Sequence, residues 1–242
     1  MRVASVALAV CLLLVAAPVG AQELTLDLGD GGSLTARSIQ LIALITVLSI
    51  APGLAIMVTC FPFVVTVLSI LRQAVGLQQS PPNMLIVSLA LFLTYFVMEP
   101  VFQAAWNDGI GPLVAGQMTV AEALPQVVDP FRGFMSNRVD PDTLAQLSAL
   151  RPGAAGNIES EAAPLSVLIP SFMLSEVARA FQIGFLVYLP FLIIDLVVAA
   201  VLMSMGMMMV PPAIVSMPFK LAFFVVADGW SLIAGSLVRS YF

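Results

Sequence analysis

This chain has no histidine and few charged side chains: of its 242 residues, 9 are Lys or Arg and 14 are Asp or Glu. Charged residues make up 10% of it, against about 25% in soluble domains, so an ordinary soluble domain is excluded. Histidine is the usual general base near neutral pH and the commonest metal ligand. No nucleophile elbow, phosphate loop, paired-carboxylate motif or metal-ligand spacing replaces it. We therefore expect no enzyme, no cofactor, no metal site and no basic patch for nucleic acid.

Cysteine is scarce as well, with Cys11 and Cys60 as its two occurrences. Residues 1–21 are predicted to form a cleavable secretory signal peptide. They begin with a basic residue, continue with an apolar run, and end with small residues before the expected cleavage site after residue 21. Cleavage would leave Cys60 alone in the mature chain, so neither an intramolecular disulfide nor a zinc site is expected. Residues 22–37 would then form a short periplasmic N-terminal segment.

Apolar residues dominate what is present, since 60% of the chain is hydrophobic and its mean hydropathy is +1.06. Residues 38–71 carry no charge and exceed the roughly 20 helical residues that cross a bilayer. Pro52-Gly53 and Pro62 interrupt this run, which predicts a broken helix. With a second helix expected at residues 84–102, it forms a first helical hairpin region over residues 38–102.

Residues 103–182 have the composition of a soluble segment, with charges of both signs and several prolines. Amphipathic patterns predict short helices around Val120–Asp129 and Pro141–Ala149. We expect a small extramembrane, periplasmic helical domain here. The fold class expected for the whole chain is all-α, with multi-pass membrane helical hairpins.

The third apolar run, Ile183–Val210, would be about 42 Å long as a straight helix, which exceeds the hydrocarbon thickness. It must tilt, kink near Pro190 or lie partly outside lipid. Residues 183–242 are expected to form a second helical hairpin. With the signal cleaved, four crossings would place both residues 103–182 and the C-terminus outside.

Methionine is concentrated at the end of that third run. Five methionines stand within seven residues, around a glycine: Met203, Met205, Gly206, Met207, Met208 and Met209. Methionine is unbranched and polarizable, so it can re-form contacts after being displaced. The cluster indicates a surface whose methionine side chains pack together into a seal and can then be displaced. The alternative from composition alone is that these methionines replace leucine in a buried helix.

Acids within the apolar runs are further candidates. Glu99, Asp195 and Asp228 each lie among apolar residues, where a charge is costly unless it is paired or wetted. They indicate a proton or ion path or, alternatively, an intersubunit ion pair of Asp195 or Asp228 with Lys220 of a neighbour. A transporter site generally needs more polar groups than this chain offers.

Glu176 and Arg179 lie in the amphipathic stretch that leads into the third run. Their i,i+3 spacing predicts an ion pair on one helix face, a modest surface effect. The alternative is that Glu176 contacts a partner subunit.

Two proline pairs, Pro81-Pro82 and Pro211-Pro212, are expected to fix turns after apolar segments. Two glycines, Gly184 and Gly206, are candidates for close helix packing, because small residues let membrane helices approach.

Several blocks of the sequence occur together in one known family. They are Val67–Gly76, Gln79–Asn83, Leu89–Thr94, Ala180–Phe185, Leu189–Leu196, Gly206–Pro212, Pro218–Leu221 and Asp228–Trp230. In this order they closely resemble the FliP family of flagellar type III secretion export-gate proteins, over roughly residues 38–240. The signal peptide and the outside domain are more similar to the flagellar branch than to the injectisome branch.

The resemblance implies an architecture that hydropathy does not. It implies a homo-oligomer of five copies that assembles with the flagellar Q and R subunits into a helical pore complex. It also implies basal-body partners, unfolded flagellar substrates, and a location in the bacterial inner membrane. Met207–Met209 resemble the gasket that closes the family's pore. A departure stands at Phe63, where the family usually carries a basic residue.

Two other functions remain open at the level of sequence. One is a standalone ion-coupled membrane transporter with Glu99 and Asp195 as carriers. The other is the equivalent subunit of a virulence injectisome.

Overall fold

The computed structural model describes residues 34–76, 81–150, 160–207 and 209–242. Over these residues it contains helices and connecting turns and no β-strand, so the all-α fold class is confirmed. The expected signal peptide at residues 1–21 and most of the segment 22–37 lie outside them. The chain divides into two units, residues 1–48 and 49–242, and each is described by itself.

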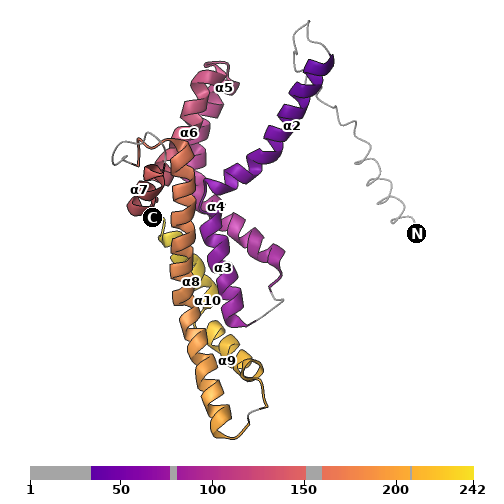
Figure 1. Cartoon of the computed structure of the whole chain (residues 1–242), viewed down its shortest axis with the longest axis vertical. Helices are drawn as coiled ribbons and strands as arrows, with labels where there is room; N and C mark the ends of the chain where they lie inside the picture. Colours follow the sequence, from indigo (N-terminus) through magenta and orange to yellow (C-terminus); the bar gives the residue numbers. More distant parts are fainter. Residues whose placement is uncertain (1–33, 77–80, 151–159, 208) are drawn as a thin grey trace, which may run out of the picture. The chain divides into compact units, whose positions relative to one another are not determined.

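The helices follow one another along the chain as shown in Figure 1. They are α2 (Leu34–Met57), α3 (Phe61–Val75), α4 (Asn83–Ala105), the π-helix η1 (Trp106–Ile110), α5 (Gly111–Val114), α6 (Val120–Ser136), α7 (Pro141–Ala149), α8 (Leu165–Ser204), α9 (Pro212–Val226) and α10 (Gly229–Arg239). In the first unit the described residues all belong to the N-terminal part of α2.

The break expected in the first apolar run occurs at residues 58–60, between α2 and α3. Pro52 and Gly53 do not interrupt the helix, because α2 continues through them to Met57. Pro62 lies in the first turn of α3, where a missing backbone N–H breaks no intrahelical hydrogen bond. The sequence therefore predicted the break correctly, and Pro62 rather than Pro52 marks it.

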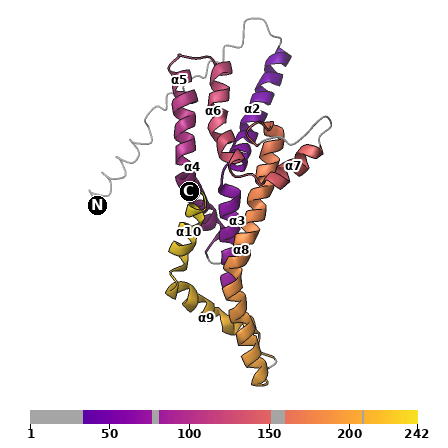
Figure 2. The same ribbon diagram turned by 90° about the vertical axis from the view of Figure 1, so that its left-hand side faces the viewer.

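Helix α3 packs along α8 and also contacts α4 (Figures 1 and 2). Its buried side chains recur every three or four residues and form one apolar face. At Gly184 of α8, an added Cβ would lie 2.4 Å from Cδ1 of Ile70 of α3. Gly184 is thus a close-packing position, as expected, because a larger residue would force the two helices apart.

Both ends of helix α8 differ from those expected for the third apolar run, Ile183–Val210. It starts at Leu165 and runs for 40 residues, about 60 Å, through Pro170 and Pro190 without ending. The boundary expected at residue 182 therefore falls inside one helix. The amphipathic stretch and the apolar run were separated by composition, but nothing between them stops a helix. The same element belongs to the expected outer domain and to the second hairpin.

A second, smaller core lies between α6, α7 and the start of α8. Its buried members include Met135, Leu144 and Phe172. The two predicted short helices are confirmed, with α6 extending to Ser136. Asp140 caps α7 by accepting hydrogen bonds from the backbone N–H and hydroxyl of Thr143, and these bonds lower the pKa of its carboxyl group.

Candidate functional site

The methionine-rich loop begins at a rigid helix end. Gly206 has φ +76°, in the left-handed region that glycine adopts without strain. Its N–H donates to the carbonyl of Met203 (3.1 Å), and the N–H of Met207 donates to the carbonyl of Leu202 (3.0 Å). This pair of bonds is a Schellman motif, the hydrogen-bonded stop of an α-helix. Gly206 is therefore a capping glycine; a Cβ there would meet nothing within 4 Å, so close packing was the wrong expectation.

The methionines on both sides of Gly206 are exposed to solvent in the single chain. The exposed fraction is 96% for Met209, 66% for Met205, 60% for Met203 and 37% for Met207. Met208 lies outside the described residues. Methionines that replaced leucine in a buried helix would be covered by neighbouring side chains. These methionines are not covered by the rest of the chain, so the alternative of a buried helix is wrong for this chain.

The proline pairs lie at the starts of helices. Pro211 precedes α9 and Pro212 is its first residue, where proline fits because its φ is already helical. Pro82 immediately precedes α4, and its carbonyl accepts from the N–H of Leu85 (3.0 Å). The methionine loop is thus held between a glycine cap on α8 and a proline start on α9.

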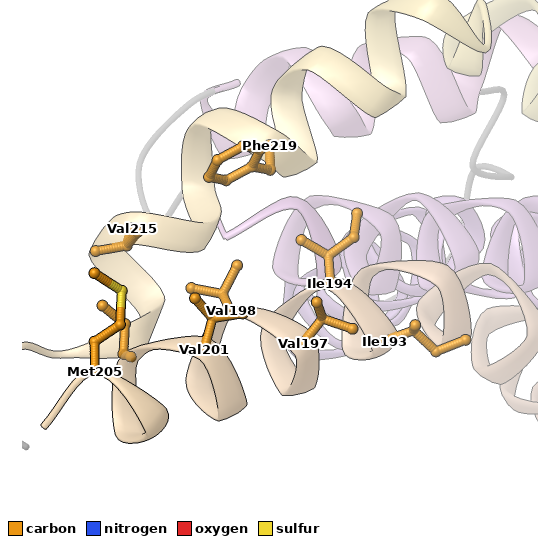
Figure 3. A pocket seen from close by; sticks show the side chains of 9 residues that line it. Ile193, Ile194, Val197, Val198, Val201, Met205, Val215 and Phe219 are labelled. Atoms are coloured by element: carbon orange, nitrogen blue, oxygen red, sulfur yellow. The ribbon is translucent and has the colours of Figure 1, made fainter. Parts of the chain in front are cut away.

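A pocket of about 550 Å³ lies between the end of α8 and the start of α9 (Figure 3). All of its lining residues are apolar: Ile193, Ile194, Val197, Val198, Val201, Leu202 and Met205 from α8, and Val215 and Phe219 from α9. A lining without a polar group provides nothing to orient or to react with a substrate. The pocket extends the apolar surface of the methionine loop along the hairpin.

An ion pair joins α8 to α9 beside this pocket. Nζ of Lys220 lies 2.6 Å from Oδ2 of Asp195, and Oγ of Ser216 donates to Oδ1 of the same carboxylate at 2.6 Å. The Lys220 ammonium also donates to the carbonyl of Ala74 in α3, at 3.1 Å. We expected Asp195 to meet Lys220 of a neighbouring subunit, but the structure forms the pair within one chain. The burial of Lys220 beside α3 explains this pairing, because a buried ammonium group needs a partner of opposite charge.

Glu176 is the most deeply buried acid among the described residues, with a side chain that is 0% exposed. Its carboxylate accepts from Nε of Arg138 at 3.2 Å and from the hydroxyl of Tyr241, and Nη1 of Arg179 lies 3.7 Å away. The Glu176–Arg179 pair is confirmed, but a modest surface effect was the wrong description. A fully buried carboxylate that accepts hydrogen bonds from Arg138 and Tyr241 ties distant parts of the chain together.

Arg138 and Tyr241 were missed by the sequence analysis. Arg138 also donates to the carbonyl of Ser240 (2.7 Å), and its guanidinium lies 4.0 Å from the centre of the Tyr241 ring. The sequence contained only an indirect indication of Arg138. A buried carboxylate needs a basic partner, and the chain has nine basic residues that could provide it. Sequence alone does not say that the residue lies 38 positions away.

The remaining acids do not form a buried path. Asp228 is exposed, with φ +47°, at the 61° bend between α9 and α10, so it is not a buried charge in this chain. Glu99 is also exposed and accepts from Nε2 of Gln103 at 3.2 Å. Among the described residues no three His, Cys, Asp or Glu side chains gather as metal ligands would.

Three of the described helices are long and apolar enough to cross a membrane: Ser38–Met57, Asn83–Val114 and Leu165–Ser204. The bent pair α9–α10 makes a fourth if it counts as one span. These segments indicate a membrane location.

The model of the FliP family matches residues 44–237. The flagellar biosynthetic protein FliP of Caulobacter vibrioides is 51% identical over 96% of this chain and 86% of its own length. The protein of the same name from Rhizobium meliloti is 46% identical over 92% of both chains, and that from Bacillus subtilis is 43% identical over 84% of this chain and 92% of its own length.

This chain belongs to the FliP family.

Family membership confirms the resemblance found in the sequence motifs. The matched residues include α3 to α9 and all but the last two residues of α10, so the methionine loop and the buried ion pairs belong to the FliP homology region. The names of these relatives state a role in flagellar biosynthesis and no catalytic activity.

Proposed function

We propose that this FliP-family chain is the pore-forming core subunit of the flagellar type III protein export gate. In this role it passes unfolded flagellar proteins across the bacterial inner membrane at the flagellar basal body and is required to build the flagellum. It performs no reaction itself. The energy for transport comes from an associated ATPase and the proton motive force.

The observation that carries this proposal is the exposed methionine loop at the tip of the α8–α9 hairpin. Met209 is 96% exposed, on a loop held between the Gly206 cap and the Pro211 start. A flexible apolar side chain on a fixed support suits a seal that must close against ions and still deform around a chain. When several copies present this loop to one axis, the methionines form a ring.

The second support is the apolar surface of the helices. On α4 and on α8 many large apolar side chains are exposed, among them Met84, Phe92, Tyr95 and Phe96, and Phe181, Phe185, Leu186 and Leu196. Apolar patches of this kind mark interaction surfaces or contact with lipid. We propose that five copies of this chain, together with the flagellar Q and R subunits, cover these faces.

Replacement of Met207, Met208 and Met209 by alanine tests the seal. Alanine removes the long side chains and keeps the backbone, so the closed gate should leak. We expect a clear rise in the ion permeability of the assembled gate in liposomes, at unchanged assembly mass. Leu150→Ala, at an apolar residue after α7 that is 83% exposed and takes no part in the loop or in the proposed interface, is the control and should leave permeability unchanged. Wild-type permeability in the triple variant would refute the seal.

A further inference from the structure

The residues after the methionine loop form an arm that returns along the molecule. We call residues 212–241, comprising α9, α10 and the two residues that follow, the C-terminal arm. It starts at the C-terminal end of α8 and runs back toward the level of Glu176 (Figures 1 and 2). Glu176 and Met205 are 29 residues apart on α8, which is about 44 Å.

The far end of the arm is inserted into a built site. We call Phe63, Phe134, Arg138 and Glu176 the tyrosine socket, because they surround Tyr241. The Tyr241 ring meets Phe63 edge-on at 5.5 Å and stacks on Phe134 at 5.9 Å between ring centres. Its hydroxyl donates to the carboxylate of Glu176.

The socket joins four elements that are far apart in sequence. Phe63 belongs to α3, Phe134 to α6 and Glu176 to α8, while Tyr241 ends the arm. Burial and the Glu176 carboxylate raise the pKa of the Tyr241 phenol, so the hydroxyl stays protonated and keeps donating. The next residue, Phe242, is 78% exposed and takes no part.

The near end of the arm is connected to the methionine loop by very few residues. The Schellman bonds of α8 end at Met207, and α9 starts at Pro212. Because α9 starts five residues after Met207, a change in the direction of α9 moves the C-terminal end of the methionine loop. Lys220 holds α9 to Asp195 in the first third of the arm, and the socket holds its far end.

We propose that Tyr241 is a positioning residue for the methionine loop: seated in the tyrosine socket, it keeps the C-terminal arm docked and the loop in its sealing place. The inference rests on the proposed function of the loop. Release of Tyr241 frees the arm and moves the seal from a distance, without any contact between Tyr241 and the methionines.

Cys60 provides a native reporter of docking. It is 0% exposed and lies in the same core cluster as the Tyr241 ring. Burial raises the pKa of its thiol to about 12, so in the docked state it remains a protonated, inaccessible thiol that maleimide does not modify. Undocking of the arm removes part of its cover.

The experiment uses the gate purified from cells with its co-assembled subunits and placed in liposomes. Tyr241→Phe removes the donor to Glu176 and keeps the ring, whereas Tyr241→Ala removes both. Phe242→Ala is the matched control. A cysteine at Ser148, a buried position on α7 outside the arm, reports global unfolding. The measurements are the labelling rates of both cysteines, the mass of the complex and its ion permeability.

We expect Tyr241→Phe to speed the labelling of Cys60 about tenfold, the factor that corresponds to losing one hydrogen bond to a charged group. Tyr241→Ala should speed it further and raise ion permeability, while the cysteine at residue 148 stays protected and the mass is unchanged. Phe242→Ala should match the wild type.

Each other result overturns the inference in a distinct way. Protected Cys60 in Tyr241→Ala would show that the socket does not hold the arm. Labelling at both cysteines would show that Tyr241 serves only global stability. Labelling of Cys60 alone without a leak, while the methionine triple variant leaks, would separate the arm from the seal and leave the proposed function intact. If the triple variant does not leak either, the proposed function fails and the inference with it.

Discussion

At the scale of single residues, Gly206 has the most specific role in the methionine loop. Its left-handed backbone and the two hydrogen bonds of the Schellman motif fix the point at which the chain leaves α8. A glycine here is required by conformation, since a Cβ would have ample space. The direction in which the loop leaves α8 is therefore set by the Gly206 cap.

Gly206→Ala should strain this position by roughly 1–2 kcal/mol, the cost of a left-handed conformation for an ordinary residue. We expect a lower unfolding temperature of the purified protein and a leak in the assembled gate. Gly206→Asn is the matched control, because asparagine tolerates this conformation far better, and it should remain close to the wild type. Equal effects of alanine and asparagine would argue that side-chain volume, and not conformation, matters at this site.

Phe63, where the resemblance predicted a basic residue, belongs to the main core. Its side chain is 0% exposed in the main core and lies edge-on to Tyr241. An apolar ring at this position serves the core and the tyrosine socket at once. The basic residues at Glu176 are Arg138 and, slightly farther away, Arg179.

At the scale of elements, the Asp195–Lys220 pair determines how the second hairpin closes. It links α8 to α9, and the bond of Lys220 to the carbonyl of Ala74 adds α3. The Lys220 side chain is 7% exposed and that of Asp195 is 32% exposed, so the acid retains some contact with solvent. Loss of either partner leaves the other at a helix interface with a neutral hydrogen-bond partner, Ser216 or the Ala74 carbonyl, and no opposite charge.

Lys220→Met should destabilise the chain by up to about 3 kcal/mol, the lower end of the range for a broken buried pair, because Asp195 is partly solvated. Adding Asp195→Leu should restore much of the loss, since two apolar side chains can replace a buried pair. Denaturant unfolding of the three variants in detergent measures this. If the double variant were less stable than Lys220→Met, the in-chain pair would not explain the effect.

The elements themselves could largely be predicted from the sequence. Length and apolar character predicted the helices, and Pro62 predicted the break before α3. Composition failed at α8, because a change from amphipathic to apolar residues does not end a helix. The partners of the buried charges could not be predicted either: Lys220 and Ala74 are separated by 146 residues, and only the packing of α9 on α3 brings them together.

In the candidate site too, local sequence patterns could be predicted and contacts between distant residues could not. The methionine cluster and the proline pairs are local patterns, so the sequence was sufficient to find them. The capping role of Gly206 and the socket around Tyr241 depend on backbone conformation and on contacts between α3, α6 and α8. Asp228 misled the sequence analysis, because an acid in an apolar run was taken as buried, whereas it occupies an exposed bend.

At the scale of the whole molecule, the described chain exposes much apolar surface, which lipid and, under the proposed function, other subunits cover. Large side chains such as Phe92 of α4 and Phe185 of α8 are exposed, and so is Met209 of the methionine loop. A lone transporter would need polar groups that converge near the middle of its spans. Here Glu99 and Asp228 are exposed and Asp195 is already paired with Lys220.

The most direct test of the account is the mass of the active protein. Native mass measurement on material purified from membranes with its co-expressed neighbours, followed by ion-permeability measurement on the same sample, joins assembly to function. We predict a stable complex with several copies of this chain and additional subunits, which holds ions back until Met207–Met209 are replaced. Single dispersed chains that move ions or substrates on their own in liposomes would contradict it.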